Sequence, residues 1–125
     1  MDGVYRKLNS EVEKVQGIQK EIQRCLQAHR QLNAQLSENE NVNEDLSHLS
    51  ESNSIYRLIG PCLIKQNLQD ATETIKKRIE FISSEIKRQD SRISDLEKQQ
   101  DCAREQILKL QQRIQQEHTK AALKA

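Results

Sequence analysis

The chain has 125 residues, of which 34% are hydrophobic, 2% aromatic and 31% charged. This composition argues against an ordinary globular domain, because a compact core needs more apolar and especially more aromatic volume. The 20 basic and 19 acidic residues leave a net charge of +1, so we expect no binding to nucleic acid or to an anionic membrane. Two states remain, which are disorder and long helices that bury only a narrow stripe.

A seven-residue repeat of apolar side chains begins near the N-terminus and is typical of a coiled coil. Its a positions are Leu8, Val15, Ile22, His29, Leu36 and Asn43, and its d positions are Glu11, Ile18, Cys25, Leu32, Asn39 and Leu46. The repeat predicts a helix over about residues 5–50, with a seam that becomes polar around Asn39. Ser and Asn side chains cluster at residues 50–54 and should end this helix, because they compete for backbone hydrogen bonds.

Two short runs of β-branched, aromatic and aliphatic residues follow and predict a β-hairpin over residues 54–66, with its turn at Gly60-Pro61. Its apolar side chains should lie on both faces, and they are Ile55, Tyr56, Leu58, Ile59, Leu63 and Ile64. An isolated two-stranded hairpin is marginal in water and has two unpaired edges. We therefore expect this segment to join a sheet supplied by other chains; the alternative is a hairpin packed on the helix ends.

A second and more regular heptad predicts a helix over about residues 68–121. Its apolar positions are Ile75, Ile79, Ile82, Ile86, Ile93, Leu96, Ile107, Leu110 and Ile114. In an antiparallel pair, a positions of one helix face d positions of the other, and residue numbers that sum to 118 satisfy this rule, as in Ile22 with Leu96. Registers one heptad away also match, but only this one centres on residue 59, next to the predicted turn. The sequence thus predicts a mainly α-helical fold, a long antiparallel two-helix coiled coil with one β-hairpin at the connecting end, forming a single domain over residues 1–125.

The ends of the two helices away from the hairpin also carry apolar residues, which are Val4, Tyr5, Leu8, Ile107, Leu110 and Ile114. Two interpretations have equal weight on physical grounds. These side chains are either ordinary seam packing or a surface that holds an apolar ligand.

No catalytic or metal-binding pattern is present in the sequence. The three cysteines and three histidines are widely scattered, no C-x-x-C pair exists, and three isolated glycines cannot form a phosphate-binding loop. We therefore expect a binding protein rather than an enzyme, with no metal and no cofactor. No stretch approaches a transmembrane helix and the N-terminus lacks the apolar core of a signal peptide, so we expect a cytosolic or nuclear location.

The hairpin segment, with its Tyr-x-Leu-x-Gly-Pro-x-Leu-x-Lys-Gln pattern at residues 56–66, resembles a β-class prefoldin subunit. Shorter similar stretches lie at residues 11–14, 34–39, 77–82 and 85–88. The resemblance runs from about residue 7 to about residue 117, and the residues from about His118 carry no family signal. The hairpin pattern is its specific part, since heptads occur in many unrelated proteins.

The resemblance implies a cytoplasmic hetero-hexamer of two α-class and four β-class subunits, built around a β-barrel to which each hairpin contributes. It also implies that the helix ends hold unfolded chains, notably actin and tubulin, and pass them to the cytosolic chaperonin without ATP hydrolysis. On this sequence the assembly segment would be residues 55–66, and the six apolar residues at the helix ends would face the client. The alternative is a coiled-coil scaffold or adaptor that binds no client.

Overall fold

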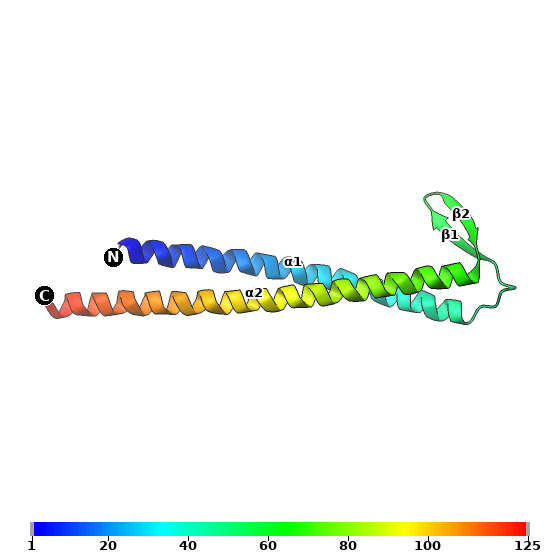
Figure 1. The fold of residues 1–125 in the computed structure, drawn as a ribbon. Helices are drawn as coiled ribbons and strands as arrows, with labels where there is room; N and C mark the ends of the chain where they lie inside the picture. Colours follow the sequence, from blue (N-terminus) through cyan, green and yellow to red (C-terminus); the bar gives the residue numbers. More distant parts are fainter. Residues whose placement is uncertain (1, 125) are drawn as a thin grey trace. The chain divides into compact units, whose positions relative to one another are not determined.

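The structure, a computed structural model, describes residues 2–124 (Figure 1). Along the chain it contains α1 (Asp2–Ser47), β1 (Ile55–Ile59), β2 (Cys62–Gln66) and α2 (Leu68–Lys124). Two long antiparallel helices with a β-hairpin between them confirm the predicted fold class. Helix α1 begins and ends about three residues earlier than the heptad indicated, and α2 continues three residues further.

Side-chain caps set the helix boundaries around the hairpin. Asn67 precedes α2, and its Oδ1 accepts a hydrogen bond of 2.7 Å from the Asp70 N–H. This bond satisfies a backbone donor that the first turn of a helix leaves free, and the Asp70 carboxylate suits the positive end of the helix dipole. After α1, Asn53 Oδ1 accepts the Ser50 N–H at 2.8 Å, while the Asn53 N–H donates to the Ser50 carbonyl at 3.0 Å. The predicted Ser and Asn cluster thus forms a turn of its own instead of a further helical turn.

The chain divides into two compact units, each of which contains parts of both helices. The first unit extends to Gln27 and resumes at Asp90, and the second covers Ala28–Gln89 and includes the hairpin. The core of the first unit is an apolar cluster of Ile18, Cys25 and Leu96, with Ile22 and Ile93 packed against it. These contacts agree with the register in which Ile22 lies opposite Leu96.

The predicted seam is the buried stripe of both helices. Every a and d position from Leu8 to Leu46, and from Thr72 to Ile114, is buried or half-buried. Glu117 and Ala121, the last two seam positions of α2, are exposed. The register places Asp2, the first described residue of α1, opposite residue 116, so both positions lie beyond the stretch of α2 that the register pairs with described residues of α1.

In the second unit, the seam continues up to the hairpin. Ala71, Ile75 and Ile82 are buried on α2, and Leu36 and Leu46 are half-buried on α1. The polar stretch around Asn39 remains helical, and the Asn39 side chain donates a hydrogen bond of 2.7 Å to the Gln35 carbonyl of its own helix. The polar interruption of the repeat is therefore accommodated locally.

Candidate binding surfaces

The hairpin turn is the two-residue Gly60-Pro61 turn that the sequence predicted. Gly60 has a φ of 57°, in the left-handed region where a Cβ atom is disfavoured. Pro61 cannot adopt a positive φ, so the turn cannot be of type I′ and follows the type II′ pattern, with glycine first. All five residues of β1 pair with all five residues of β2, so the turn fixes the strand register. The register in turn determines which side chains share a face of the hairpin.

The backbone pairing places apolar side chains on both faces of the hairpin. Tyr56, Leu58 and Leu63 share one face with Lys65, and Leu58 lies directly opposite Leu63. Leu58 is 69% exposed and Leu63 67% exposed. The other face has Ile59 and Ile64, which are also exposed, and Ile55, which is half-buried. Exposed apolar side chains on both faces of one small sheet are unusual for a surface that meets only water.

Both outer edges of the hairpin lack a partner strand. Within residues 2–124 the sheet has two strands only, paired β1 to β2. A free edge presents a row of backbone N–H and C=O groups, and proteins normally cover, charge or pair such edges. Lys65 and Arg57 are the charged side chains of the two strands, so the edges are only weakly protected by charge.

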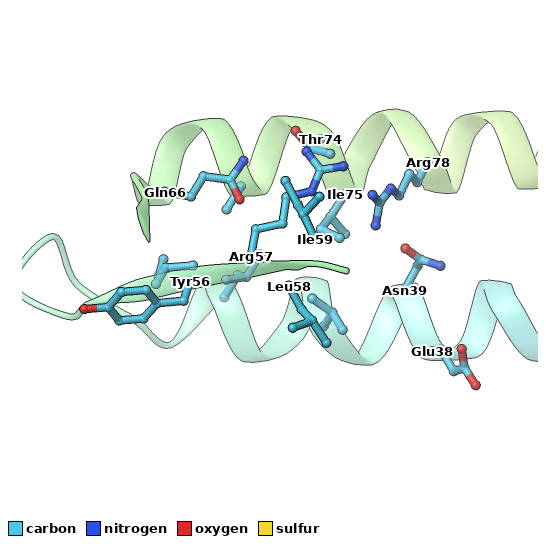
Figure 2. Close-up of a pocket in the computed structure, with 14 residues that line it drawn as sticks. Glu38, Asn39, Tyr56, Arg57, Leu58, Ile59, Gln66, Thr74, Ile75 and Arg78 are labelled. Atoms are coloured by element: carbon cyan, nitrogen blue, oxygen red, sulfur yellow. The ribbon is translucent and has the colours of Figure 1, made fainter. Parts of the chain in front are cut away.

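A groove of about 570 Å³ lies between β1 and the neighbouring parts of the two helices (Figure 2). Figure 2 shows Arg57 and Ile59 on one side of β1, and Tyr56 and Leu58 on the other, as strand alternation requires. The helix residues that line the groove are Glu38, Asn39, Val42, Leu46, Ala71, Thr74, Ile75 and Arg78. The hairpin therefore does not lie flat on the helix ends, and the groove beside β1 is open.

The six apolar residues expected at the helix ends lie in the first unit and differ in exposure. Val4 is buried, whereas Leu8, Ile107, Leu110 and Ile114 are half-buried. Val4 occupies the d position one heptad before Glu11, and the register places it opposite Ile114. These five side chains therefore contribute to the seam.

Tyr5 is the exception among the six. It is 40% exposed, and its hydroxyl forms a hydrogen bond of 3.1 Å with Nε2 of His118. This bond joins Tyr5, near the start of α1, to His118, near the end of α2, where the sequence carried no family signal. Tyr5 thus combines a partly exposed ring with a hydrogen bond to α2.

Phe81 and Leu108, two exposed apolar residues of α2, were not selected from the sequence, and a third, Leu123, is exposed on the same helix. The heptad contained the signal that identifies them. Phe81 and Leu123 occupy c positions and Leu108 a b position, and these positions point away from the seam. An apolar residue at b or c does not stabilise a two-helix pair and is available to other partners.

The side chains in the described part of the chain form no arrangement suited to catalysis. Among residues 2–124, no group of three His, Cys, Asp or Glu side chains could hold a metal ion. Cys25 is buried in the apolar cluster, and Cys62 and Cys102 are exposed free thiols. No helix in this range is long and apolar enough to span a membrane. The features that remain are the hairpin and the exposed apolar side chains of the helices.

Comparison with known proteins identifies the family. A family model described as "Prefoldin subunit" matches residues 9–117. The chain is 43% identical to prefoldin subunit 6 of Mus musculus over 112 residues, which are 90% of this chain and 88% of the mouse protein. Identity to prefoldin subunit 6 of Arabidopsis thaliana is 44%, over 90% of this chain and 87% of the plant protein.

The fold is similar to that of solved structures at much lower sequence identity. The crystal structure of the prefoldin beta subunit from Thermococcus strain KS-1 superposes with a TM-score of 0.74 at 16% identity, covering 80% of this chain and 88% of that one. Since the family model covers most of the chain and the relatives match over nearly their full length, the chain belongs to the prefoldin family, as a β-class subunit similar to subunit 6 of this non-enzymatic co-chaperone complex.

Proposed function

We propose that this chain occupies one β-class position in a cytoplasmic prefoldin hetero-hexamer of two α-class and four β-class subunits. Its hairpin joins a β-barrel shared between subunits, and its 125 residues act as a single domain. The helix ends near Tyr5 bind unfolded actin and tubulin chains, which the complex passes to the cytosolic chaperonin.

One observation carries the assembly half of this proposal, namely the hairpin with exposed apolar residues on both faces and two unpaired edges. Strands from neighbouring subunits would pair with both edges. The same strands would remove Leu58, Leu63 and Ile64 from water. In a family whose members assemble with one another, other prefoldin subunits are the partners that such a hairpin fits.

The client half of the proposal assigns contact to the ends of the helices. The residues of this surface are Val4, Tyr5, Leu8, Ile107, Leu110 and Ile114. Tyr5 offers the largest exposed area of the six, and the exposed Leu123 adds apolar surface on the same unit. The half-buried members become available when the end of the helix pair opens, because helix termini fray more readily than their middles.

Such a surface can hold a client without ATP. Each subunit contributes a small apolar patch, and several patches that engage one unfolded chain together give a high avidity. No single contact is tight, so the client can leave one patch at a time and be transferred. The absence of any nucleotide-binding pattern in the sequence is consistent with this mechanism.

A coiled-coil scaffold without a client role is the second candidate. A scaffold would bind its partners through the exposed flanks of the seam and would have no use for exposed apolar side chains at the helix ends. The two functions therefore predict different effects of substitutions at Tyr5 and Leu123.

The test is suppression of actin aggregation by the assembled complex. The variant combines Tyr5→Gln with Leu123→Gln, and the matched control is Val12→Gln, an exposed apolar residue of the same unit that lies further along α1. We expect both complexes to assemble and the double variant to bind actin about thirtyfold more weakly, since each of the two lost apolar contacts costs about 1 kcal/mol. Suppression equal to that of the wild type would move the client site elsewhere and favour the scaffold.

A further inference from the structure

Phe81, the single phenylalanine of the chain, lies on α2 and is 66% exposed. It occupies a c position between Ile79 and Ile82, which belong to the seam, so it lies outside the seam. One exposed apolar residue is ordinary on a protein surface. The residues that surround Phe81 therefore decide whether it lies on a binding surface.

Phe81 borders a shallow depression of about 480 Å³ in the second unit. The other residues that line it are Gln35 and Asn39 from α1 and Thr74, Lys77, Arg78 and Ile82 from α2. Both charged side chains in this lining are basic. We call this area the Phe81 surface; its centre is apolar and its rim carries positive charge.

The Phe81 surface adjoins the groove beside the hairpin. Asn39, Thr74 and Arg78 line both depressions. Figure 2 shows Asn39 and Arg78 approaching one another from the two helices at the end of the groove away from Tyr56. A chain seated along β1 therefore lies next to the Phe81 surface, with Asn39, Thr74 and Arg78 at the boundary.

We propose that the Phe81 surface belongs to the assembly interface, and that the neighbouring prefoldin subunit whose strand pairs with the hairpin also covers Phe81. The partner places an apolar side chain on the ring and a carboxylate beside Lys77 and Arg78. Aromatic and Arg side chains are enriched in the centres of protein interfaces, and an apolar centre with a charged rim is their usual arrangement. This inference rests on the proposed function, because it takes the hairpin to be the site of assembly.

Competition for places in the complex tests the proposal. Wild-type chain and a Phe81→Gln variant that differ in mass are co-expressed with a limiting supply of the other subunits, and native mass spectrometry gives their ratio in the hexamers. Gln has good helix propensity, so α2 should remain intact. Leu108→Gln is the control, because Leu108 is 56% exposed on the same helix but lies in the other unit.

We expect Phe81→Gln to be under-represented by about tenfold, the effect of losing one well-buried interface contact, and Leu108→Gln to be incorporated equally. Lys77→Glu should also be under-represented, and its deficit should decrease at high salt. Circular dichroism of each isolated chain checks the fold. If Phe81→Gln loses helicity, the incorporation of Lys77→Glu tests the proposal in its place.

Incorporation of Phe81→Gln equal to that of the wild type would overturn the inference. This holds even if the hexamers that contain Phe81→Gln bind client more weakly. A Leu58→Asp chain in the same assay separates the two proposals. If Leu58→Asp is excluded while Phe81→Gln enters normally, the hairpin assembly stands and the Phe81 inference fails. If Leu58→Asp also enters normally, the proposed assembly itself fails.

Discussion

Substitution of Leu58 examines the assembly role of the hairpin most closely. The side chain is 69% exposed, and its cross-strand neighbour Leu63 is 67% exposed. Complete burial of a Leu side chain contributes about 1.5–3 kcal/mol, so covering the remaining two-thirds should contribute about 1–2 kcal/mol. Leu58→Ala loses most of this and should weaken incorporation about tenfold.

Leu58→Asp should have a much larger effect, because it places a carboxylate in an apolar interface. An unpaired charge buried in this way costs about 3–5 kcal/mol, which is enough to prevent assembly. The isolated chain should not be affected in the same way. Leu58 is already exposed there, and surface substitutions usually change stability by about 0.5 kcal/mol or less.

The assay is co-purification of the other prefoldin subunits with a tagged chain, together with the helicity of the chain alone. Leu108→Asp serves as a control, because it introduces the same charge at an exposed leucine outside the hairpin. We expect the Asp variant at position 58 to lose its partners and keep its helicity. Recovery of partners in wild-type amounts would refute the assembly role of this face.

Three further experiments test the structure of the chain itself. With the native cysteines replaced by Ala, Ile22→Cys with Leu96→Cys should form a disulfide within one chain, since both residues belong to one apolar cluster; disulfides found only between chains would contradict the register. Gly60→Ala should destabilise the chain by about 1–2 kcal/mol, because Gly60 has a positive φ. Gly17→Ala should stabilise it by up to about 1 kcal/mol, because Gly17 lies on α1 with nothing near the added Cβ. Thermal unfolding measures both changes, and changes of the same sign would contradict this prediction. Glu11→Leu should raise the unfolding temperature, because Glu11 Oε2 is buried at a seam position without a hydrogen-bond partner among the described residues. Glu13 is exposed, so Glu13→Leu should leave the unfolding temperature unchanged. Equal increases in the two variants would show that the buried carboxylate is not the cause.

The heptad predicted the buried stripe because a coiled-coil seam depends only on local spacing. Ile22 and Leu96 meet in the core of the first unit as the repeat and the turn position required. Gly60-Pro61 was equally readable, since few residue pairs suit a two-residue hairpin turn. These features follow from short-range rules.

The exposure of individual residues at the helix ends could not be predicted in the same way. Whether Val4 is buried depends on where α1 begins, and helix ends are set by fraying and capping that a repeat does not encode. Glu117 and Ala121 are likewise exposed although the heptad places both at seam positions, because the register pairs neither of them with a described residue of α1. Phe81 was missed for a different reason, because it lies at a c position and the heptad selects only a and d positions.

The mass and composition of the complex that co-purifies with this chain from its native source decide whether the chain assembles as proposed. We expect a hexamer of six small subunits that contains one copy of this chain and five other prefoldin subunits. A complex of this chain with itself alone, or with partners that are not prefoldin subunits, would contradict it.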